Sequence, residues 1–251
     1  MRVFVLTRAV YGMDWSVEAN ARRLAMFRAV TVPCIAAQSF RDFEWVLAVD
    51  RADPYRARRI ALARTAGVPV RVLYVSYDSE SVQSRACVAP NAYAAPWRDT
   101  IDSAFDATLT VRLDDDDALA PRTLRRMRNR AKLLDSYSAI IATNGIRMWN
   151  NQWEYVRHAT NAMAGCFSPQ GDARVVYDYS HKYVHVVVPN VVHIGGKPSW
   201  LWVRHADTLS KHRVAKRPMN DAVRAMFPGT DWDFLAKATA AQGVAIDRIP
   251  Q

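Results

Sequence analysis

The stretch that decides the fold predicted for this chain is Arg112-Leu113-Asp114-Asp115-Asp116-Asp117-Ala118-Leu119. It follows an apolar, β-prone segment at 107–111 and precedes Pro121 and a helical pattern. Four consecutive carboxylates repel one another unless water or a cation neutralises them, and Mg²⁺ and Mn²⁺ favour oxygen ligands. In open α/β sheets, ligands bind beyond the carboxyl ends of the strands. An acidic run at a strand end therefore predicts a metal site that holds a nucleotide diphosphate.

Two other interpretations compete with this one. A calcium loop of the EF-hand type fails, because Leu119 stands where that loop needs a glycine and Arg125 where it needs a bidentate glutamate. A solvated acidic turn, which offsets the charge of the basic helix after it, stays open because short motif matches often arise by chance.

The composition indicates a globular chain. Its 251 residues, half of them hydrophobic, suffice for one large α/β domain or two small ones. We find no apolar window long enough to span a membrane, and the short apolar run before Arg8 predicts a first strand and not a secretory signal. The scattered cysteines Cys34, Cys87 and Cys166 indicate neither a disulfide framework nor a zinc site. They fit a reducing cytoplasm, either bacterial or that of a phage-infected host.

The formal net charge of +10 favours a polyanionic partner. Such a partner could be DNA, an anionic membrane surface or a phosphorylated acceptor. The alternative is compositional, because arginine and alanine are abundant and lysine is scarce, as a GC-rich genome would produce.

The first 117 residues alternate between strand and helix patterns. We expect strands over 2–6, 44–49, 68–75 and 107–111, and helices over 16–31, 33–38, 53–67 and 97–105. This alternation predicts a mostly parallel sheet with helices on both faces. Neither GxGxxG nor GxxxxGK[ST] occurs, so carboxylates and a metal would have to hold any bound nucleotide.

The second half is less regular. We expect a helix over 121–134, strands over 138–143, 163–167, 184–188 and 191–196, and a hairpin of 145–149 with 152–157 across Asn150-Asn151. Residues 172–182 are ambiguous, 197–205 are aromatic and basic, and helices are expected over 220–227 and 231–241. The helix expected over 121–134 is basic, so it presents either a solvated face or an anion-facing surface. We predict a single domain over 1–251, with an irregular second half.

Two motifs carry a resemblance to a known family. Leu113 to Leu119 fits the segment apolar-Asp-x-Asp-Asp-x-apolar of the family-2-like glycosyltransferases of GT-A fold, which is Rossmann-like. More narrowly, Arg112 to Leu119, and Pro198-Ser199-Trp200-Leu201 followed by His205, resemble the group called "putative rhamnosyltransferases". Residues 176–181 are similar to its middle section. The resemblance covers about residues 1–210; the chain is shorter than that group, and its tail matches no part of it.

The resemblance implies roles for the acidic run. Asp114 and Asp116 would be the aspartates of the DxD motif, with Asp116 a direct metal ligand. Asp114 would bind the ribose or a water near the metal, and Asp115 would also line the cofactor site. His205 would be a second metal ligand, although a lone histidine is as often a packing residue.

The resemblance implies a nucleotide-sugar-binding half at 1–117 and an acceptor half with C-terminal helices at 118–251. It also implies a donor pocket around the first strands. Thr7 and Arg8 would border the nucleobase, and Asp50 would meet the base or the ribose. Arg112 or Arg204 could donate charge-assisted hydrogen bonds to the diphosphate.

The activity implied is a metal-dependent glycosyl transfer from a nucleotide-sugar, most simply a UDP- or dTDP-sugar, to an acceptor hydroxyl. Mn²⁺ or Mg²⁺ would neutralise the charge that develops on the departing diphosphate. An inverting reaction needs a carboxylate base, and Asp172 and Asp178 are candidates in the acceptor half, although each could be a plain loop aspartate. Four tryptophans could stack on a sugar or base, or belong to the core: Trp149, Trp153, Trp200 and Trp202.

The acceptor is left open between two hypotheses. One is a glycan or lipid-linked cell-surface saccharide, with the basic helix against anionic lipid. The other is a hydroxymethylated base in phage DNA, which the basic run from Arg204 to Arg217 would suit. A non-catalytic nucleotide-, sugar- or nucleic-acid-binding protein and a nucleotidyltransferase are the alternatives of other classes.

Overall fold

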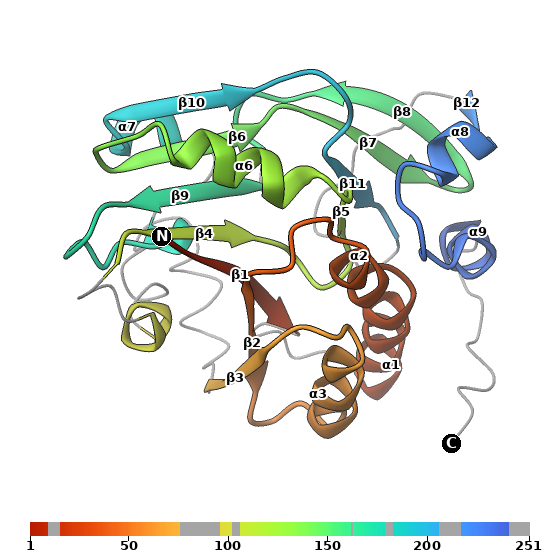
Figure 1. The fold of residues 1–251 in the computed structure, drawn as a ribbon. Helices are drawn as coiled ribbons and strands as arrows, with labels where there is room; N and C mark the ends of the chain where they lie inside the picture. The colour runs from red at the N-terminus through yellow and green to blue at the C-terminus, as the bar shows by residue number, and fades with distance from the viewer. Residues whose placement is uncertain are drawn as a thin grey trace.

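The computed structural model describes residues 1–9, 16–75, 96–101, 106–161, 163–178, 183–205 and 217–240. These residues form a seven-stranded sheet of order β10-β6-β9-β4-β1-β2-β3 and a five-stranded sheet of order β12-β8-β7-β11-β5 (Figure 1). The strands are β1 (Arg2–Ala9), β2 (Glu44–Asp50), β3 (Val70–Val75), β4 (Thr108–Arg112), β5 (Ala118–Leu119), β6 (Ser138–Ala142), β7 (Asn144–Trp149), β8 (Gln152–Arg157), β9 (Ala164–Ser168), β10 (Asn190–Ile194), β11 (Trp200–Val203) and β12 (Arg217–Pro218). The helices are α1 (Val17–Met26), η1 (Phe27–Thr31), α2 (Val32–Ala36), α3 (Arg56–Arg64), α6 (Thr123–Ala131), η2 (Val176–Asp178), α7 (Val184–Val187), α8 (Asp221–Arg224) and α9 (Trp232–Ala240).

The large sheet is parallel except for β9, which runs antiparallel to both of its neighbours, β4 and β6. The carboxyl ends of β1, β2, β4, β6 and β10 therefore meet at one edge, together with the start of β9. We call this the carboxyl edge, and the other end of the strands the opposite edge. Because strands β6, β9 and β10 come after the acidic run, both sequence halves contribute to this sheet.

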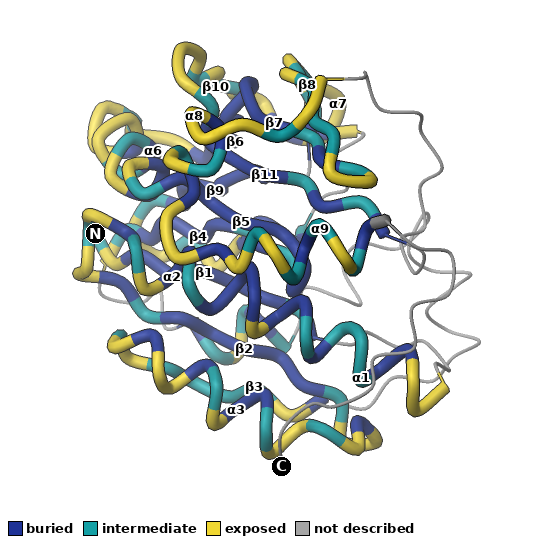
Figure 2. Tube along the Cα trace, turned by 90° about the vertical axis from the view of Figure 1, so that its right-hand side faces the viewer, coloured by how far each residue is buried: buried dark blue, intermediate teal, exposed yellow. Residues whose placement is uncertain are grey.

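Helices cover both faces of the large sheet, because successive strand residues point to opposite sides. On β1, Val3 and Val5 belong to a core shared with α1, α2, α3 and α6, whereas Phe4 and Leu6 belong to a second core. The second core is closed by residues 96–100, η2 and α7. In Figure 2 the central strands, such as β2 and β9, are largely buried, and the exposed positions lie on the outer helices and on outer strands such as β8 and β10. The predicted α/β fold, with a mostly parallel sheet and helices on both faces, is confirmed.

The small sheet is built on the predicted hairpin. Asn150 and Asn151 adopt φ angles of 48° and 52°, the left-handed conformation that a tight turn between β7 and β8 requires. Gly145 faces Trp200 of β11, and a Cβ atom at this glycine would lie 2.0 Å from the indole ring. The small sheet shares the first core with the large one, through residues such as Ile146 and Leu201.

The structure differs from the predicted elements in two segments. Residues 184–188, predicted as a strand, form the short helix α7, whose Val184 is buried while Val186 and Val187 are exposed. A run of β-branched residues favours a strand only where a neighbour can pair with it, and β6 instead pairs with β10. The aromatic stretch at 200–203, for which we predicted no element, is the strand β11.

The predicted helix 97–105 is helical over 96–100, and residues 102–105 lie outside the described part of the chain, as do 179–182 and 206–216. Among the described residues, no helix has the length and apolar character needed to cross a membrane.

Candidate functional site

The acidic run lies at the carboxyl edge, directly after β4, and its side chains are largely buried. Asp115, Asp116 and Asp117 expose 0%, 6% and 8% of their surface, and Asp114 is half-buried. A solvated acidic turn is therefore excluded. Buried carboxylates need charged or hydrogen-bonding partners, and each of the four finds a different set.

Asp114 is held by two arginines. Arg112 donates from Nε and Nη2 to its two carboxylate oxygens at 3.0 and 2.8 Å, and Arg8 Nη2 lies 3.5 Å from Oδ1. Both guanidinium groups also lie on the ring of Tyr177, with Cζ atoms 4.9 and 5.6 Å from its centroid. Burial alone would raise the pKa of Asp114, but the charges of Arg112 and Arg8 outweigh it and hold the pKa below its usual range.

Asp115 points into the protein, between α1 and α3. Arg23 Nη2 donates to its Oδ1, and Arg59 Nη1 lies 3.7 Å from Oδ2. Arg59 has no exposed surface, and it also donates to Asp53 Oδ2 at 2.8 Å and to the carbonyl of Asn20 at 3.2 Å. This aspartate is thus part of a buried ionic network beneath the site.

Asp116 meets groups from two distant parts of the chain. Arg23 Nη1 donates to Oδ2. His205 follows β11, and its Nε2 lies 3.0 Å from the same oxygen. His205 is itself 5% exposed. Burial would raise the pKa of Asp116, but the charge of Arg23 and the hydrogen bond from His205 lower it. The predicted pairing of Asp116 with His205 at one site agrees with this geometry.

Arg23 is the residue that the sequence analysis missed. Its guanidinium bridges the carboxylates of Asp115 and Asp116, with one amino group on each. A signal for it exists in the sequence, because Asn20 and Arg23 are polar residues on the helix face that also carries Leu24 and Phe27. Polar residues three apart on an apolar stripe indicate a buried polar contact.

Asp117 ties the acidic run to the small sheet. Its Oδ1 accepts the backbone N–H of Val203 at 3.1 Å, and its carbonyl oxygen accepts the hydroxyl of Thr31 at 3.1 Å. Burial raises the pKa of Asp117 well above its usual range, and the neighbouring charges of Asp116 and Asp114 add to that shift. This side chain therefore orients β11, and with it His205.

The other residues predicted for the donor pocket are placed as follows. Asp50 ends β2 at the carboxyl edge, half-buried, and accepts the N–H of Ala52 at 2.8 Å. Thr7 has no exposed surface, and its hydroxyl accepts the indole N–H of Trp45 at 2.9 Å. The hydroxyl of Thr7 thus makes a core contact, while Asp50 lies where a ligand beyond the strand ends could meet it.

The structure does not bring Asp172 to the acidic run. Because β9 is antiparallel, the loop after it emerges at the opposite edge, and there Asp172 accepts N–H groups of Arg174 at 2.9 Å (backbone) and 3.0 Å (Nε). Asp178 ends η2, next to Tyr177, but its carboxylate pairs with Arg98 and with the N–H of Val175. Neither predicted base has a carboxylate free of an arginine.

The basic helix α6 uses several arginines for structural contacts. Arg126 donates to Ser199 Oγ at 2.8 Å and to the carbonyl of Lys197 at 3.3 Å, and Arg128 packs over the ring of Phe40. These contacts fix the segment that precedes β11. Arg122 and Arg130 on the same helix are exposed.

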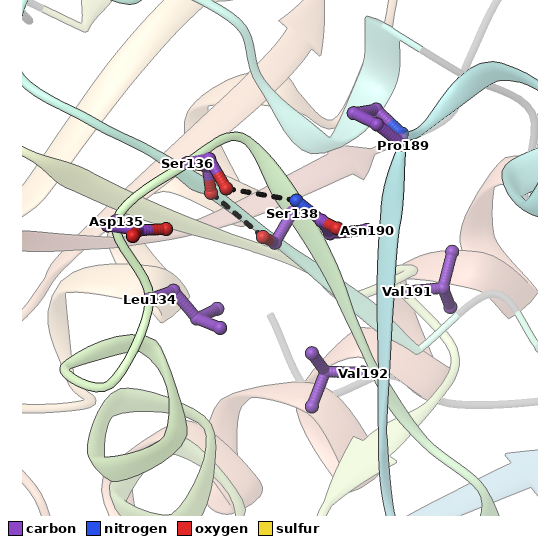
Figure 3. A pocket seen from close by; sticks show the side chains of 8 residues that line it. All are labelled: Leu134, Asp135, Ser136, Ser138, Pro189, Asn190, Val191 and Val192. Atoms are coloured by element: carbon purple, nitrogen blue, oxygen red, sulfur yellow. Dashed lines mark hydrogen bonds between the residues drawn. The ribbon is translucent and has the colours of Figure 1, made fainter.

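A pocket of about 540 Å³ lies at the opposite edge, where β6 and β10 begin (Figure 3). Its wall includes Ser136, Ser138 and Asn190, joined by hydrogen bonds of 2.8 Å from Ser138 Oγ to the Ser136 carbonyl and 2.9 Å from Asn190 Nδ2 to Ser136 Oγ. This pocket is remote from the acidic run. The burial and the ionic contacts of the four aspartates make the acidic run the candidate functional site.

Comparison with protein families places this geometry in context. The model of the family described as "Putative rhamnosyl transferase" matches residues 16–217. The chain belongs to this family. Its members are described as transferases, and the resemblance predicted from the acidic run and the Pro198 segment is confirmed. Among curated proteins, none matches the chain.

Several solved structures are similar to this chain at low TM-scores. Mouse xyloside xylosyltransferase 1 is 9% identical with a TM-score of 0.43, covering 76% of this chain and 84% of its own. A "putative nucleotide-diphospho-sugar transferase" from Desulfovibrio desulfuricans G20 is 10% identical with a TM-score of 0.40, covering 81% and 82%. A "putative glucose-1-phosphate thymidylyltransferase" from Bacillus anthracis is 9% identical with a TM-score of 0.43, covering 79% and 88%. At TM-scores this low, the likenesses say nothing of this chain's activity.

Proposed function

We propose that this protein is a metal-dependent glycosyltransferase that moves a sugar from a nucleotide-sugar, a UDP- or dTDP-sugar, to an acceptor hydroxyl. The observation that carries the proposal is the buried contact of Asp116 with His205 at the carboxyl edge, inside a chain of the rhamnosyl transferase family. A carboxylate and an imidazole that converge from distant segments at the ligand-binding edge of an α/β sheet are typical of a site and not of packing.

The donor set fits a divalent cation. Asp116 and His205 offer an oxygen and a nitrogen 3.0 Å apart. Among the described residues, no three acidic, histidine or cysteine side chains converge as a complete metal cage. Mg²⁺ and Mn²⁺ commonly use only one or two protein ligands and take the rest from substrate phosphates and water. Bound there, such an ion would neutralise the charge that builds on the diphosphate as the sugar departs.

The chain's own cations would then orient the donor. Arg23 already pairs with the carboxylates of Asp115 and Asp116, and a guanidinium binds phosphate oxygens with the same geometry as carboxylate oxygens. We propose that Arg23 moves from Asp116 toward the diphosphate when the donor binds. Arg8 and Arg112 hold Asp114 in a fixed orientation, which suits a carboxylate that receives the hydroxyls of a ribose. Asp50 would contact the base.

The proposal is tested by thermal unfolding with a panel of nucleoside diphosphates and UDP- and dTDP-sugars, each with and without Mn²⁺. A ligand at a hundredfold excess over its Kd stabilises the folded state by about 2.7 kcal/mol. We expect one nucleotide to raise the Tm only with Mn²⁺, and Asp116→Asn to abolish that rise. Asp172→Asn is the matched control, because it also neutralises one aspartate but lies at the opposite edge, and it should keep the full shift.

The reaction itself is followed with a radiolabelled nucleotide-sugar. Label that moves to a saccharide supports the proposal, and label that moves to DNA with hydroxymethylated bases assigns the acceptor to nucleic acid. Pyrophosphate release from a nucleoside triphosphate and a sugar phosphate would replace the proposal with a nucleotidyl transfer. If no nucleotide shifts the Tm in the presence of Mn²⁺, the transferase proposal fails.

A further inference from the structure

A second group of polar and aromatic side chains lies beside the acidic run, and the proposed donor site does not use it. Trp202 of β11 is half-buried, and its ring centroid lies 4.6 Å from that of the buried Trp200. Arg204 Cζ lies 5.0 Å from the Trp202 centroid, and the His158 ring is edge-on to it at 5.8 Å. Arg147 of β7 is the register partner of Trp202, and Glu154 of β8 is the register partner of Arg147. We call these five residues the Trp202 cluster.

The Trp202 cluster occupies one face of the small sheet. Side chains of register partners project to the same side, so Trp202, Arg147 and Glu154 form a row across three strands. Arg147 Nη1 and Glu154 Oε1 are 2.9 Å apart. The opposite face of the same strands carries Leu201 and Ile146, which belong to the first core.

The cluster lies at the carboxyl edge, next to the proposed donor site. Val203 and His205, which hold Asp117 and Asp116, flank Arg204 in the sequence. His158 stands in the segment that leads into β9, whose start pairs with the ends of β4 and β6. A molecule bound on Trp202 would therefore lie close to the acidic run.

The hydrogen-bonding capacity of the cluster is incompletely used. Within the described part of the chain, the buried Nε atoms of Arg147 and Arg204 find no acceptor. His158 Nδ1 accepts the N–H of Thr160 at 3.2 Å, so its Nε2 carries the proton and is a donor. Burial, together with the charge of Arg147, lowers the pKa of His158, so the ring is neutral at pH 7.

This chemistry matches a sugar ring. A pyranose has an apolar face that packs on an indole and hydroxyls around its rim that both donate and accept hydrogen bonds. The cluster supplies the indole, a carboxylate acceptor in Glu154 and donors in Arg147, Arg204 and His158. Because Glu154 offsets the charge of Arg147, Arg204 alone carries an unbalanced charge in the cluster, which suits uncharged hydroxyls better than a row of phosphates.

We infer that the Trp202 cluster is the acceptor subsite and that it binds a saccharide, with one pyranose ring taking the place of the Arg204 guanidinium against Trp202. Trp200 supports the indole, and the sugar hydroxyls bond to Glu154 and the two arginines. The inference rests on the proposed glycosyl transfer, since it names the acceptor class for that reaction.

The test is saturation-transfer NMR on the full chain with methyl pyranosides of glucose, galactose, mannose and rhamnose as probes, in the presence of Mn²⁺ and either UDP or dTDP. We expect at least one glycoside to receive saturation at its ring protons. Trp202→Ala should weaken its binding about tenfold, which corresponds to about 1.4 kcal/mol, and Trp202→Phe should weaken it less. Glu154→Gln, which keeps the side-chain shape but removes the charge, should also raise the Kd.

Tyr155→Ala is the matched control. This exposed aromatic residue follows Glu154 on β8, so its side chain projects to the face opposite the Trp202 cluster. It should leave glycoside binding unchanged. A Trp202→Ala variant that still gains Tm with the nucleotide and Mn²⁺ is folded at the donor site, so its loss of glycoside binding is local.

Three results would overturn the inference: no glycoside binds, Trp202→Ala binds glycosides as wild type does, or Trp202 substitutions instead abolish a salt-sensitive affinity for single-stranded oligonucleotides. The donor proposal is judged separately, by the metal-dependent nucleotide shift of wild type and by the radiolabel and pyrophosphate assays.

Discussion

The acidic run and the loop after β9 both combine aspartates with arginines, but they lie at opposite edges of the large sheet. Asp172 pairs with Arg174, two residues away in sequence, and that arginine's side chain is 46% exposed. Asp115 pairs with Arg23 and Arg59, which come from two helices of the first half and whose side chains are 11% and 0% exposed. The same residue types therefore form a local surface pair in one place and an interior network in the other.

The difference lies in what surrounds each pair. An exposed ion pair contributes little, because water already solvates both charges. A buried pair holds two charges that water cannot reach, so each partner depends on the other. The predictions below test this contrast between the carboxyl edge and the opposite edge, beginning with the largest effect.

Removing one arginine of the buried network should destabilise the folded protein. Arg59→Ala removes the fully buried cation that pairs with Asp53 and lies 3.7 Å from Asp115, and we expect it to lower the free energy of unfolding by about 3–5 kcal/mol. Arg174→Ala at the opposite edge should cost less than about 1 kcal/mol. Urea unfolding of the two variants beside wild type measures both values, and equal losses would show that the two edges do not differ.

The proposed activity should depend on one edge only. Asp116→Asn removes the charge that would hold the cation, and we expect donor turnover to fall about a hundredfold or more, as when a group that stabilises developing charge is lost. Asp172→Asn should stay within about twofold of wild type, because Asp172 lies far from the site. Release of nucleoside diphosphate from a nucleotide-sugar is the measurement, and a large loss in Asp172→Asn would restore that residue as a candidate base.

The carboxyl edge also depends on β11, which has no counterpart at the opposite edge. Gly145→Ala would place a Cβ atom 2.0 Å from the Trp200 ring, and we expect a loss of about 1–3 kcal/mol in the free energy of unfolding. The metal-dependent nucleotide shift should shrink with it, since β11 presents Val203 and His205 to the acidic run. Gly195→Ala is the control, because no atom lies within 4 Å of the added Cβ and it should be close to neutral.

The smallest effect concerns pH. The pKa of His158 is lowered by burial and by Arg147, so between this folded value and about 6.5 the unfolded chain binds more protons than the folded chain. The contribution of His158 to stability is therefore lost as the pH falls through that window and is constant above it. NMR titration of the His158 ring should give a pKa below that of a model peptide. His158→Gln should remove this part of the pH dependence, and a pKa at or above the peptide value would contradict the burial of the ring.

Much of the fold followed from local patterns. The alternation of apolar strands with capped helices gave the parallel sheet, and Asn150-Asn151 marked the β7–β8 hairpin because few other residues adopt two successive positive φ angles easily. The prediction was wrong at 184–188, where a valine-rich segment forms a helical turn. Strand propensity depends on a pairing partner, and that partner is fixed by the whole sheet.

The candidate site was foreseen in part. The acidic run, Arg8, Arg112 and His205 are brought together as the motifs suggested, although the roles assigned to them stay predictions. Arg23 escaped notice because a single arginine in an amphipathic helix is usually solvated. Asp172 was misplaced for another reason. Its position in the second half says nothing of which edge it occupies, and the antiparallel direction of β9 decides that.

By itself, the sequence determined the α/β class, the strand that carries the acidic run, and the family. The class and the strand depend on the periodicity of apolar residues, and the family depends on a contiguous motif. Both can be read from neighbouring residues without knowing the tertiary structure. Tertiary structure alone decided which cation faces which carboxylate, that Asp115 turns inward, and that Trp202 joins Arg147 and Glu154 in one row. Such contacts depend on strand order and register, which bring together side chains that lie far apart along the chain.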